Sequence, residues 1–306
     1  MKFEHKFRSQ SQYLASVIVP TFNRAFLLDA TLRSLTKQDI NPADYEVVVC
    51  DDGSTDNSYE LFKSIATGAY AHWKYVFYPD RGYHPTRARN MGIRLAEGRL
   101  SIFLDCGNLA TSALVRGHVE AAGDAQKAVI GYIYNYGDNG VYDDESITII
   151  DTNDIDKTVA DISTRTSRLL YDTRERFYGP CEEDISRYAL DWGLYWTGNC
   201  SAPTAAAISA GGFDEQLTSW GCDDTDFGLA LKTAGIQFTL NREAAAVQYP
   251  HEKDYSKRRI SAAANSVIRF NNFPRPDTKA LANGADLEAM ILGSLSEAPR
   301  SSANTG

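Results

Sequence analysis

The segment spanning residues 218–235 has the residue types and spacing best suited to chemistry. Trp220 stands just before three acidic residues, Asp223, Asp224 and Asp226, and an apolar helical pattern follows them. One aspartate at a helix start is explained by the unpaired N–H groups and the dipole there, which stabilise negative charge. Two adjacent aspartates with a third beside them repel one another and call for a cation, a proton or a substrate hydroxyl. Because clustered acids mark functional sites, we place catalysis here, with helix capping alone as the alternative.

Polar side chains also follow short apolar runs that are typical of buried strands. The runs at 16–19, 47–50 and 101–104 lead into Pro20-Thr21-Phe22-Asn23, Asp51-Asp52 and Asp105, respectively. Helical spacing follows the first two runs, and this alternation predicts an α/β fold with a mainly parallel sheet covered by helices on both faces. Such sheets bind ligands beyond the carboxyl ends of their strands, so we expect the three segments to meet at one crevice.

Length, composition and charge narrow the class of protein. The chain has 306 residues, of which 43% are hydrophobic and 23% charged, as in an ordinary globular domain with additions. Its net charge of −9 argues against nucleic acid as the main partner, although a local basic pocket for one diphosphate stays compatible with it. Five widely spaced cysteines without a C-x-x-C pair indicate reduced thiols rather than a disulfide framework or a zinc site.

The start of the chain and its hydropathy bear on location. Residues 1–12 lack the apolar core of a signal peptide. No apolar run approaches the roughly 18–20 residues that a membrane-spanning helix needs. We therefore expect a cytoplasmic protein without a membrane span.

Five motifs together resemble those of one enzyme family. They are VIVPTFNR at 17–24, VVVCDDGSTD at 47–56, FLDCGN at 103–108, GGFDE at 211–215 and WGCDDTDFGLAL at 220–231. In order and spacing they resemble a nucleotide-sugar glycosyltransferase of the GT-A fold, family 2 type. The later half is similar to the C-terminal module of chondroitin-type polymerases, galactosyltransferases and polypeptide N-acetylgalactosaminyltransferases. The resemblance implies transfer of a hexose or N-acetylhexosamine from a UDP-sugar to a carbohydrate, peptide or small-molecule acceptor.

The resemblance also implies a division of the chain. It covers residues of about 15–130 and 196–252, and we assign the segments as follows: 1–14 is an N-terminal lead-in, 15–134 the nucleotide-sugar-binding half, 135–195 an insertion of short helices and loops that forms a possible acceptor region, 196–276 the catalytic and acceptor half, and 277–306 a flexible tail. The aromatic end of the insertion is expected either to form part of an acceptor surface or to pack in the core.

On the nucleotide side, the resemblance implies that Pro20, Thr21 and Asn23 line a pocket and that Asp52 accepts from the base N–H, with Asp51 beside it. A carboxylate suits uracil, which presents an N3–H donor between two carbonyl groups. An Asx turn with a helix cap is the alternative explanation of this acidic pair.

Basic side chains are expected near the diphosphate. Of Arg81, Arg87 and Arg89, which stand where such enzymes carry residues facing the nucleotide, we assign the nucleotide contact to Arg87. Arg258 and Arg259 are alternatives for neutralising the leaving diphosphate if the metal site described next is wrong.

The family's metal motif is Asp-x-Asp, whose second carboxylate binds Mn²⁺ or Mg²⁺. Here the string reads Asp105-Cys106-Gly107-Asn108, so that second carboxylate is absent. Hard divalent cations take oxygen ligands, and the resemblance implies that Asp105, His251, two phosphate oxygens and water complete the shell. An exposed or structural histidine is the alternative for His251.

For the reaction, the resemblance implies that a carboxylate takes the proton of the attacking acceptor hydroxyl. Asp224 is the expected general base, and Asp223 is expected to bind a sugar hydroxyl. Trp220 would offer an apolar platform to a sugar face, and Asn199 and Asp214 would border the sugar pocket. Direct displacement predicts inversion of the anomeric centre.

Two other functions compete with transfer. A catalytically weak binding module, or a partner subunit of a glycosyltransferase complex, would explain the incomplete metal motif, but the retained acidic pair at 223–224 argues against it. A nucleotidyltransferase would be expected to carry a Gly-rich basic loop after its first strand, where this chain has Pro-Thr-Phe-Asn.

Overall fold

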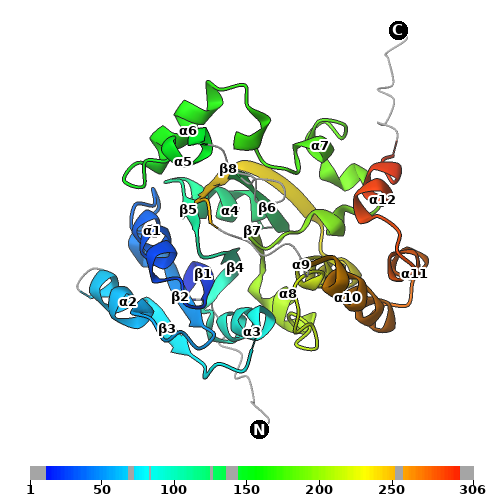
Figure 1. Cartoon of the computed structure of the whole chain (residues 1–306), viewed down its shortest axis with the longest axis horizontal. Coiled ribbons are helices and arrows are strands. Elements are labelled where there is room, and N and C mark those ends of the chain that lie inside the picture. Colours follow the sequence, from blue (N-terminus) through cyan, green and yellow to red (C-terminus); the bar gives the residue numbers. More distant parts are fainter. Residues whose placement is uncertain are drawn as a thin grey trace.

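A computed structural model describes residues 12–67, 72–82, 84–124, 127–135, 144–251 and 258–296, without the side chains of residues 258 and 259. These residues form one β-sheet flanked by helices (Figure 1). The predicted α/β class is confirmed. The first eleven residues of the expected lead-in, the last ten of the expected tail, and the side chains of Arg258 and Arg259 lie outside the described residues.

The sheet has eight strands in the order β3-β2-β1-β4-β7-β6-β8-β5. β1 is parallel to β2 and β4, and β2 is parallel to β3. β7 runs antiparallel to both β4 and β6, β8 is parallel to β6, and β5 is antiparallel to β8. The sheet is therefore parallel in its N-terminal half and mixed beyond β4. The strands are β1 Tyr13–Thr21, β2 Tyr45–Asp51, β3 Lys74–Phe77, β4 Gly98–Leu104, β5 Asn108–Ala110, β6 Ala128–Tyr134, β7 Asn199–Pro203 and β8 Phe238–Gln248.

The helices connect and cover these strands. They are α1 Ala25–Leu35, α2 Ser58–Ala66, α3 Pro85–Leu95, α4 Leu114–Ala122, α5 Asp144–Thr148, α6 Ile155–Ser163, α7 Glu175–Tyr178, α8 Thr204–Ser209, α9 Asp223–Thr233, α10 Arg258–Asn272, α11 Pro276–Ala282 and α12 Leu287–Gly293. Short 3-10 helices occur at Pro42–Asp44, Arg168–Leu170, Ile185–Arg187 and Asp191–Leu194.

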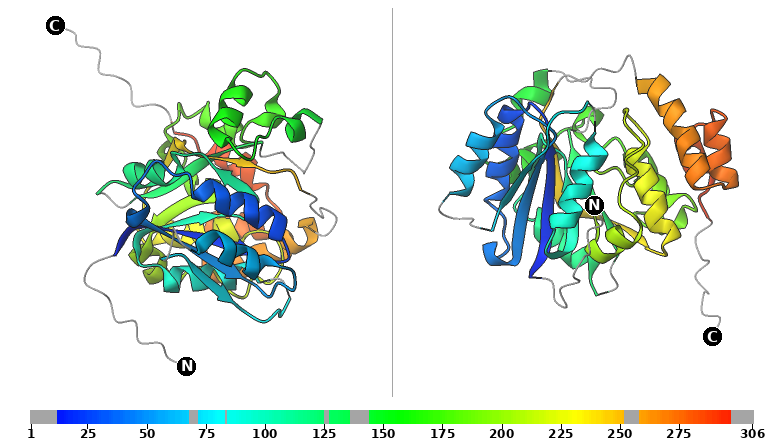
Figure 2. Two further views of the ribbon diagram at one scale, coloured as in Figure 1. Left: turned by 90° about the vertical axis from the view of Figure 1, so that its left-hand side faces the viewer. Right: turned by 90° about the horizontal axis from the view of Figure 1, so that it is seen from below.

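The central strands are buried on both faces because successive side chains point to opposite sides of a sheet. Ile18, Val48 and Phe103 join the apolar core on the side of α3, α8 and α9. The residues next to them in the strands join the core on the side of α1, α2 and α4. Figure 2 shows the sheet lying between these two groups of helices. Runs of consecutive apolar residues are what such doubly covered strands require.

The insertion at 135–195 contains short helices and turns, as expected. Its aromatic end lies in the core rather than at an acceptor surface, because the side chains that would form that surface are fully buried: Phe177, Tyr178, Tyr188, Trp192 and Tyr195. Burying these large rings against the sheet removes more apolar area from water than an exposed surface would. Of the two alternatives for the aromatic end of the insertion, packing in the core therefore holds for these residues.

The expected flexible tail also differs from the structure. Residues 276–282 and 287–293 form α11 and α12, and Leu281 and Ile291 are buried in the core. A seven-residue helix gains its stability from such packing rather than from its own propensity, which explains why periodicity alone did not indicate it. Within the described part of the chain, no helix combines the length and apolar character needed to cross a membrane.

Candidate active site

The carboxyl ends of β1 and β2 form the first side of the site. The N–H of Asp52 donates to the carbonyl of Thr21 (3.0 Å), and Asn23 Oδ1 accepts from the N–H of Thr55 (2.8 Å). Thr21 is buried, Pro20 is half-buried and Asn23 is exposed. Asn23 has a φ of 50°, a left-handed conformation that asparagine tolerates better than most residues. The predicted nucleotide-side residues therefore lie together at one edge of the sheet.

The two acids after β2 have different surroundings. Asp51 Oδ1 accepts from the N–H groups of Gly53 (3.1 Å) and Ser54 (2.8 Å), and its Oδ2 accepts from the hydroxyl of Tyr75. Asp51 is thus the centre of an Asx turn, and only 2% of it is exposed. One of its oxygens is held within the turn and the other by Tyr75 of β3, so its expected place among the nucleotide-binding residues stays a prediction. Asp52 stays a candidate as well.

Arg87 of α3 contacts Asp52. Its Nη2 donates to Asp52 Oδ1 (3.0 Å), the N–H of His84 donates to Asp52 Oδ2 (3.1 Å), and the guanidinium lies 4.9 Å from the ring centre of Tyr78. Burial raises the pKa of Asp52, and the hydrogen bonds from Arg87 and His84 offset part of that rise. The guanidinium of Arg87 is thus held by Asp52, and its expected nucleotide contact stays a prediction.

Arg89, two residues further along α3, joins the two halves of the site. Its Nη2 donates to Asp105 Oδ1 (2.8 Å) and its Nη1 to Asp223 Oδ2 (3.0 Å), and Asp224 Oδ1 lies 3.9 Å from Nη1. The Arg89 side chain is only 6% exposed. Burial alone would lower the pKa of Arg89, but the three carboxylates raise it above its ordinary value. Asp105 therefore meets the acids of 223–224 through a buried guanidinium.

Asp223 and Asp224 begin α9, as the sequence indicates. Asp223 is buried, whereas the Asp224 side chain is 32% exposed and accepts a hydrogen bond from the Thr197 hydroxyl at Oδ1. Burial and the charge of Asp223 raise the pKa of Asp224 to about 7, although Arg89 lowers it. A carboxylate that is half-protonated near neutral pH is suited to accept a proton during a reaction.

Asp226 lies one turn further into α9 and faces another partner. It is 3% exposed and lies 3.8 Å from Arg269 of α10, and burial raises its pKa to about 6. Asp226 thus connects the first turn of α9 to α10.

His251 lies beside the loop that follows Asp105. Tyr249 donates its N–H to the carbonyl of Gly107 (2.8 Å), and a Cβ atom on Gly107 would lie 3.8 Å from His251 Nδ1. His251 Nδ1 lies 3.0 Å from the carbonyl oxygen of Tyr249, which places the proton on Nδ1 and the lone pair on Nε2. The Asp105 side chain is 42% exposed. The two predicted metal ligands therefore flank the same loop.

Asn199 is not at a sugar pocket, which corrects the expectation for this residue. It is completely buried in β7, where Nδ2 donates to the carbonyls of Ala244 (2.8 Å) and Tyr132 (3.1 Å) and Oδ1 lies 2.8 Å from His118 Nε2. Burial lowers the pKa of His118 to about 4. The Asn199 amide provides hydrogen-bond partners for buried polar groups that would otherwise be unpaired and would destabilise the fold.

Replacing Asn199 with alanine should therefore lower the free energy of unfolding by about 3 kcal/mol, because two carbonyls and an imidazole lose their partner. Urea unfolding followed by circular dichroism measures this loss. The exposed Asn153, changed to alanine, is the control and should cost under about 0.5 kcal/mol. A stable Asn199→Ala protein with weakened sugar binding would restore the sugar-pocket assignment.

Asp214 and Trp220 lie in the segments that lead into α9. Asp214 Oδ1 accepts from the N–H of Gln216 (2.9 Å), and its Oδ2 accepts from the Asn272 amide (2.6 Å). Trp220 is 43% exposed, an uncommon exposure for so large an apolar ring. The carbohydrate contacts of both residues stay predictions.

Two functional candidates were not identified from the sequence. Arg89 was grouped with two other arginines, and Thr197 of the WTGNC segment was not chosen. Helical spacing offered one signal, since Arg87 and Arg89 cannot lie on the same face of a helix. Nothing local marks Thr197, whose contact with Asp224 joins residues 27 positions apart in the chain.

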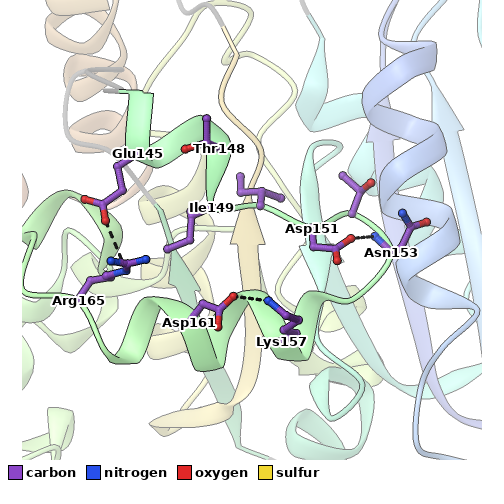
Figure 3. Close-up of a pocket in the computed structure, with 10 residues that line it drawn as sticks. Glu145, Thr148, Ile149, Asp151, Asn153, Lys157, Asp161 and Arg165 are labelled. Carbon is purple, nitrogen blue, oxygen red and sulfur yellow. Dashed lines mark hydrogen bonds and ion pairs between the residues drawn. The ribbon is translucent and has the colours of Figure 1, made fainter.

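A separate open pocket of about 570 Å³ lies between α5, α6 and the turn joining them (Figure 3). Four of its charged residues form ion pairs, Arg165 with Glu145 at 3.5 Å and Lys157 with Asp161 at 2.6 Å, and Asp151 Oδ1 accepts from the N–H of Asn153 (2.9 Å). The pocket is not part of the candidate active site, because Asp52, Asp105, Asp223 and Asp224 do not line it.

Fold and site together define the class. The parallel half of the sheet carries Asp52 and Asp105 beyond its strand ends, and these acids face the acidic start of a helix. This is the arrangement of a GT-A α/β protein. A family model described as glycosyl transferase family 2 matches residues 16–180, which is more than half of the chain. The chain belongs to this family.

Curated relatives agree with this membership. Validoxylamine A glucosyltransferase of Streptomyces hygroscopicus subsp. limoneus is 37% identical over 259 residues, covering 84% of this chain and 56% of that protein. Chondroitin synthase of Escherichia coli is 28% identical and covers 83% of this chain and 37% of that protein. The chain thus spans little more than half the length of the first relative and less of the second.

Solved structures share the fold. The mannosyltransferase PcManGT from Pyrobaculum calidifontis, in complex with GDP-Man and Mn²⁺, has a TM-score of 0.59 at 20% identity, covering 92% of this chain and 73% of that one. TarS of S. aureus in complex with UDP-GlcNAc has a TM-score of 0.56 at 17% identity, covering 92% of this chain and 79% of that one.

Proposed function

We propose that this protein transfers a sugar from a UDP-sugar to an acceptor hydroxyl, with Asp224 as the general base. One observation carries the proposal: Asp224 is partly exposed at the start of α9 and lies 3.9 Å from the same guanidinium that binds Asp105 beyond β4. A base on the acceptor side and the strand ends of the donor side thus border one site. Membership of glycosyl transferase family 2 supports the reaction class.

UDP is the proposed nucleotide because Asp52 offers a carboxylate at the sheet edge, where the uracil N3–H needs an acceptor. Two similar proteins support this choice of sugar donor. One is named a glucosyltransferase, and the fold of the other was solved with UDP-GlcNAc. A hexose or an N-acetylhexosamine is therefore the proposed group, and the acceptor is a carbohydrate, a peptide or a small molecule.

The proposed step is a direct displacement. Asp224 takes the proton of the acceptor hydroxyl as its oxygen bonds to the anomeric carbon, and the bond from that carbon to the β-phosphate oxygen breaks, with its electron pair leaving on UDP. Attack from the face opposite the leaving group inverts the anomeric centre. Asp223, held by Arg89, would bind a sugar hydroxyl, and Trp220 would support an apolar sugar face.

A divalent cation fits the donor side only together with the diphosphate. Among the described residues, no cluster of three or more His, Cys, Asp or Glu side chains is arranged to hold a metal ion. Gly107, at the position of the motif's second acid, has a φ of 99°, which disfavours any side chain there. Asp105 and His251 would hold Mn²⁺ or Mg²⁺, with phosphate oxygens as further ligands, as such ions often bind. The bound cation would neutralise charge on the leaving diphosphate.

Thermal unfolding with UDP or GDP, each with and without Mn²⁺, tests this proposal first, followed by UDP release from a panel of UDP-sugars. We expect UDP to raise the midpoint more than GDP, and Mn²⁺ to increase the UDP effect. No stabilisation by either nucleotide would exclude a transferase. Stabilisation without turnover would favour the nucleotide-sugar-binding module or partner subunit.

The rate of transfer should depend on pH in a defined direction. A general base acts only when ionised, and the raised pKa of about 7 belongs to Asp224. The rate should therefore fall below pH 7, approaching tenfold per pH unit, and level off above it. Initial rates from pH 5 to 9 at saturating donor measure this, and a profile flat down to pH 5 would contradict the assignment.

A further inference from the structure

The short segment that carries Trp220 is held by a helix from a distant part of the chain. The Nδ2 of Asn265, in α10, lies within hydrogen-bond distance of three consecutive carbonyls: those of Ser219 (3.1 Å), Trp220 (3.4 Å) and Gly221 (2.7 Å). Its Oδ1 accepts from the Ser219 hydroxyl (3.1 Å). Only 2% of Asn265 is exposed. One buried amide therefore contacts every residue from 219 to 221.

The segment needs this support because its backbone is unusual. Gly221 has a φ of 99° and Cys222 a φ of 70°, in the left-handed region that non-glycine residues rarely adopt. A Cβ atom on Gly221 would approach the Cβ of Ala262, in the preceding turn of α10, to 3.1 Å. Strained conformations persist only where surrounding contacts determine them, and here α10 supplies these contacts.

A second residue of α10 holds the part of the segment that follows. Arg269 stands four residues after Asn265, so both side chains lie on the same face of the helix. Its Nη2 donates to the carbonyl of Cys222 (2.9 Å) and to the Thr225 hydroxyl. Arg269 thus holds the start of α9, while Asn265 holds the residues around Trp220. The two anchors are distinct.

We propose that Asn265 is a positioning residue for the acceptor: it fixes the backbone under Trp220 and so sets where a sugar acceptor lies relative to Asp224. This inference rests on the proposed transferase function. Asn265 touches neither the donor-side strand ends nor Asp224 in the contacts described above. Loss of its amide should therefore weaken acceptor binding more than it slows donor chemistry.

The first test needs no substrate. The chain has four tryptophans, and Trp220, at 43% exposed, is the most exposed of them. In Asn265→Ala, acrylamide quenching of tryptophan fluorescence should increase by about twofold, because the segment loses its anchor. Trp220→Phe identifies the part of the signal that belongs to this ring. Val267→Ala, on the exposed side of α10, is the matched control and should leave quenching unchanged. Unchanged quenching in Asn265→Ala would overturn the inference.

The second test is kinetic, with UDP-glucose as donor and p-nitrophenyl glucoside as the acceptor probe. Asn265→Ala should raise the acceptor KM about tenfold, the size expected from lost hydrogen bonds, with kcat and acceptor-free donor hydrolysis within about twofold of wild type. Asn265→Asp, which turns a carboxylate towards three carbonyls, should have a larger effect, and Ser219→Ala a smaller one. Equal losses in kcat and in donor hydrolysis would indicate a general structural role and overturn the inference.

The two proposals fail in different ways. If wild type turns over no UDP-sugar, the proposed function is wrong, and the acceptor role of Asn265 falls with it. If wild type is active and Asn265→Ala has an unchanged acceptor KM, only the inference about Asn265 is wrong.

Discussion

Asp224→Asn should reduce sugar transfer by roughly 10²- to 10⁴-fold while UDP binding stays within about twofold of wild type. The amide keeps the shape of the side chain and an oxygen that accepts from the Thr197 hydroxyl, but it accepts no proton from the attacking acceptor. Asp224 lies on α9, whereas the proposed nucleotide contacts lie beyond β1 and β2. UDP release in the presence of acceptor measures transfer, and calorimetric titration with UDP measures binding.

Asp226→Asn is the matched control for this result, because Asp226 begins the same helix but faces Arg269 instead of Arg89. It should change the rate by less than about fivefold while altering stability. Should UDP binding collapse in Asp224→Asn, this acid would belong to the donor site. A rate within a few fold of wild type would mean that another group takes the proton.

Removal of the Arg89 guanidinium should have the second large effect. In Arg89→Met, three carboxylates share a partly buried site without their cation, and breaking such a buried ion pair costs about 3–5 kcal/mol of unfolding free energy. Arg89→Lys should be intermediate, because an ammonium group does not reproduce the two-pronged contact with Asp105 and Asp223. Urea unfolding measures stability. The pH dependence of the remaining transfer activity measures the electrostatic effect of Arg89 on Asp224.

The direction of that pH change follows from the charges. Arg89 lowers the pKa of Asp224, so its loss should raise this pKa further and move the acidic limb of the rate profile to higher pH. Arg94→Met is the control on the same helix, since Arg94 pairs with Glu215 at 3.3 Å with both side chains more than 40% exposed. It should cost under about 1 kcal/mol. If the Arg89→Met protein is as stable and as active as Arg94→Met, Arg89 is not the cation that stabilises the three carboxylates of the site.

Local patterns were enough to predict the fold class and the approximate place of the site. Apolar runs that end at Asp52 and Asp105 predicted parallel strands with ligand-binding ends, because a strand covered on both faces has to be apolar throughout. The acids after Trp220 predicted the start of α9, because a helix N-terminus favours negative charge. Both predictions use residues that are close together in the chain.

The partners of these residues could not be predicted in the same way. Asp51 and Asp52 are adjacent and chemically identical, yet one is the centre of a turn and the other meets Arg87. Asn199 lies in the segment that resembles the glycosyltransferase family, but the register of β7 between β4 and β6 buries its side chain. Burial and register depend on the whole sheet, so the same residue type takes a structural or a functional place according to its neighbours.

The sequence by itself therefore determined the α/β class, the strand ends and the acidic helix start, since each follows from residue type and short-range spacing. Only the tertiary structure decided which charges meet. Arg89 reaches Asp223 across 134 positions of the chain, and Asn265 reaches Ser219 across 46. Such contacts arise from the packing of α3 and α10 against the region around the start of α9. Hydrogen bonds and ion pairs act over a few ångströms in space, irrespective of separation along the chain, and that is why the acids at 223–224 could be located from the sequence but their supports could not.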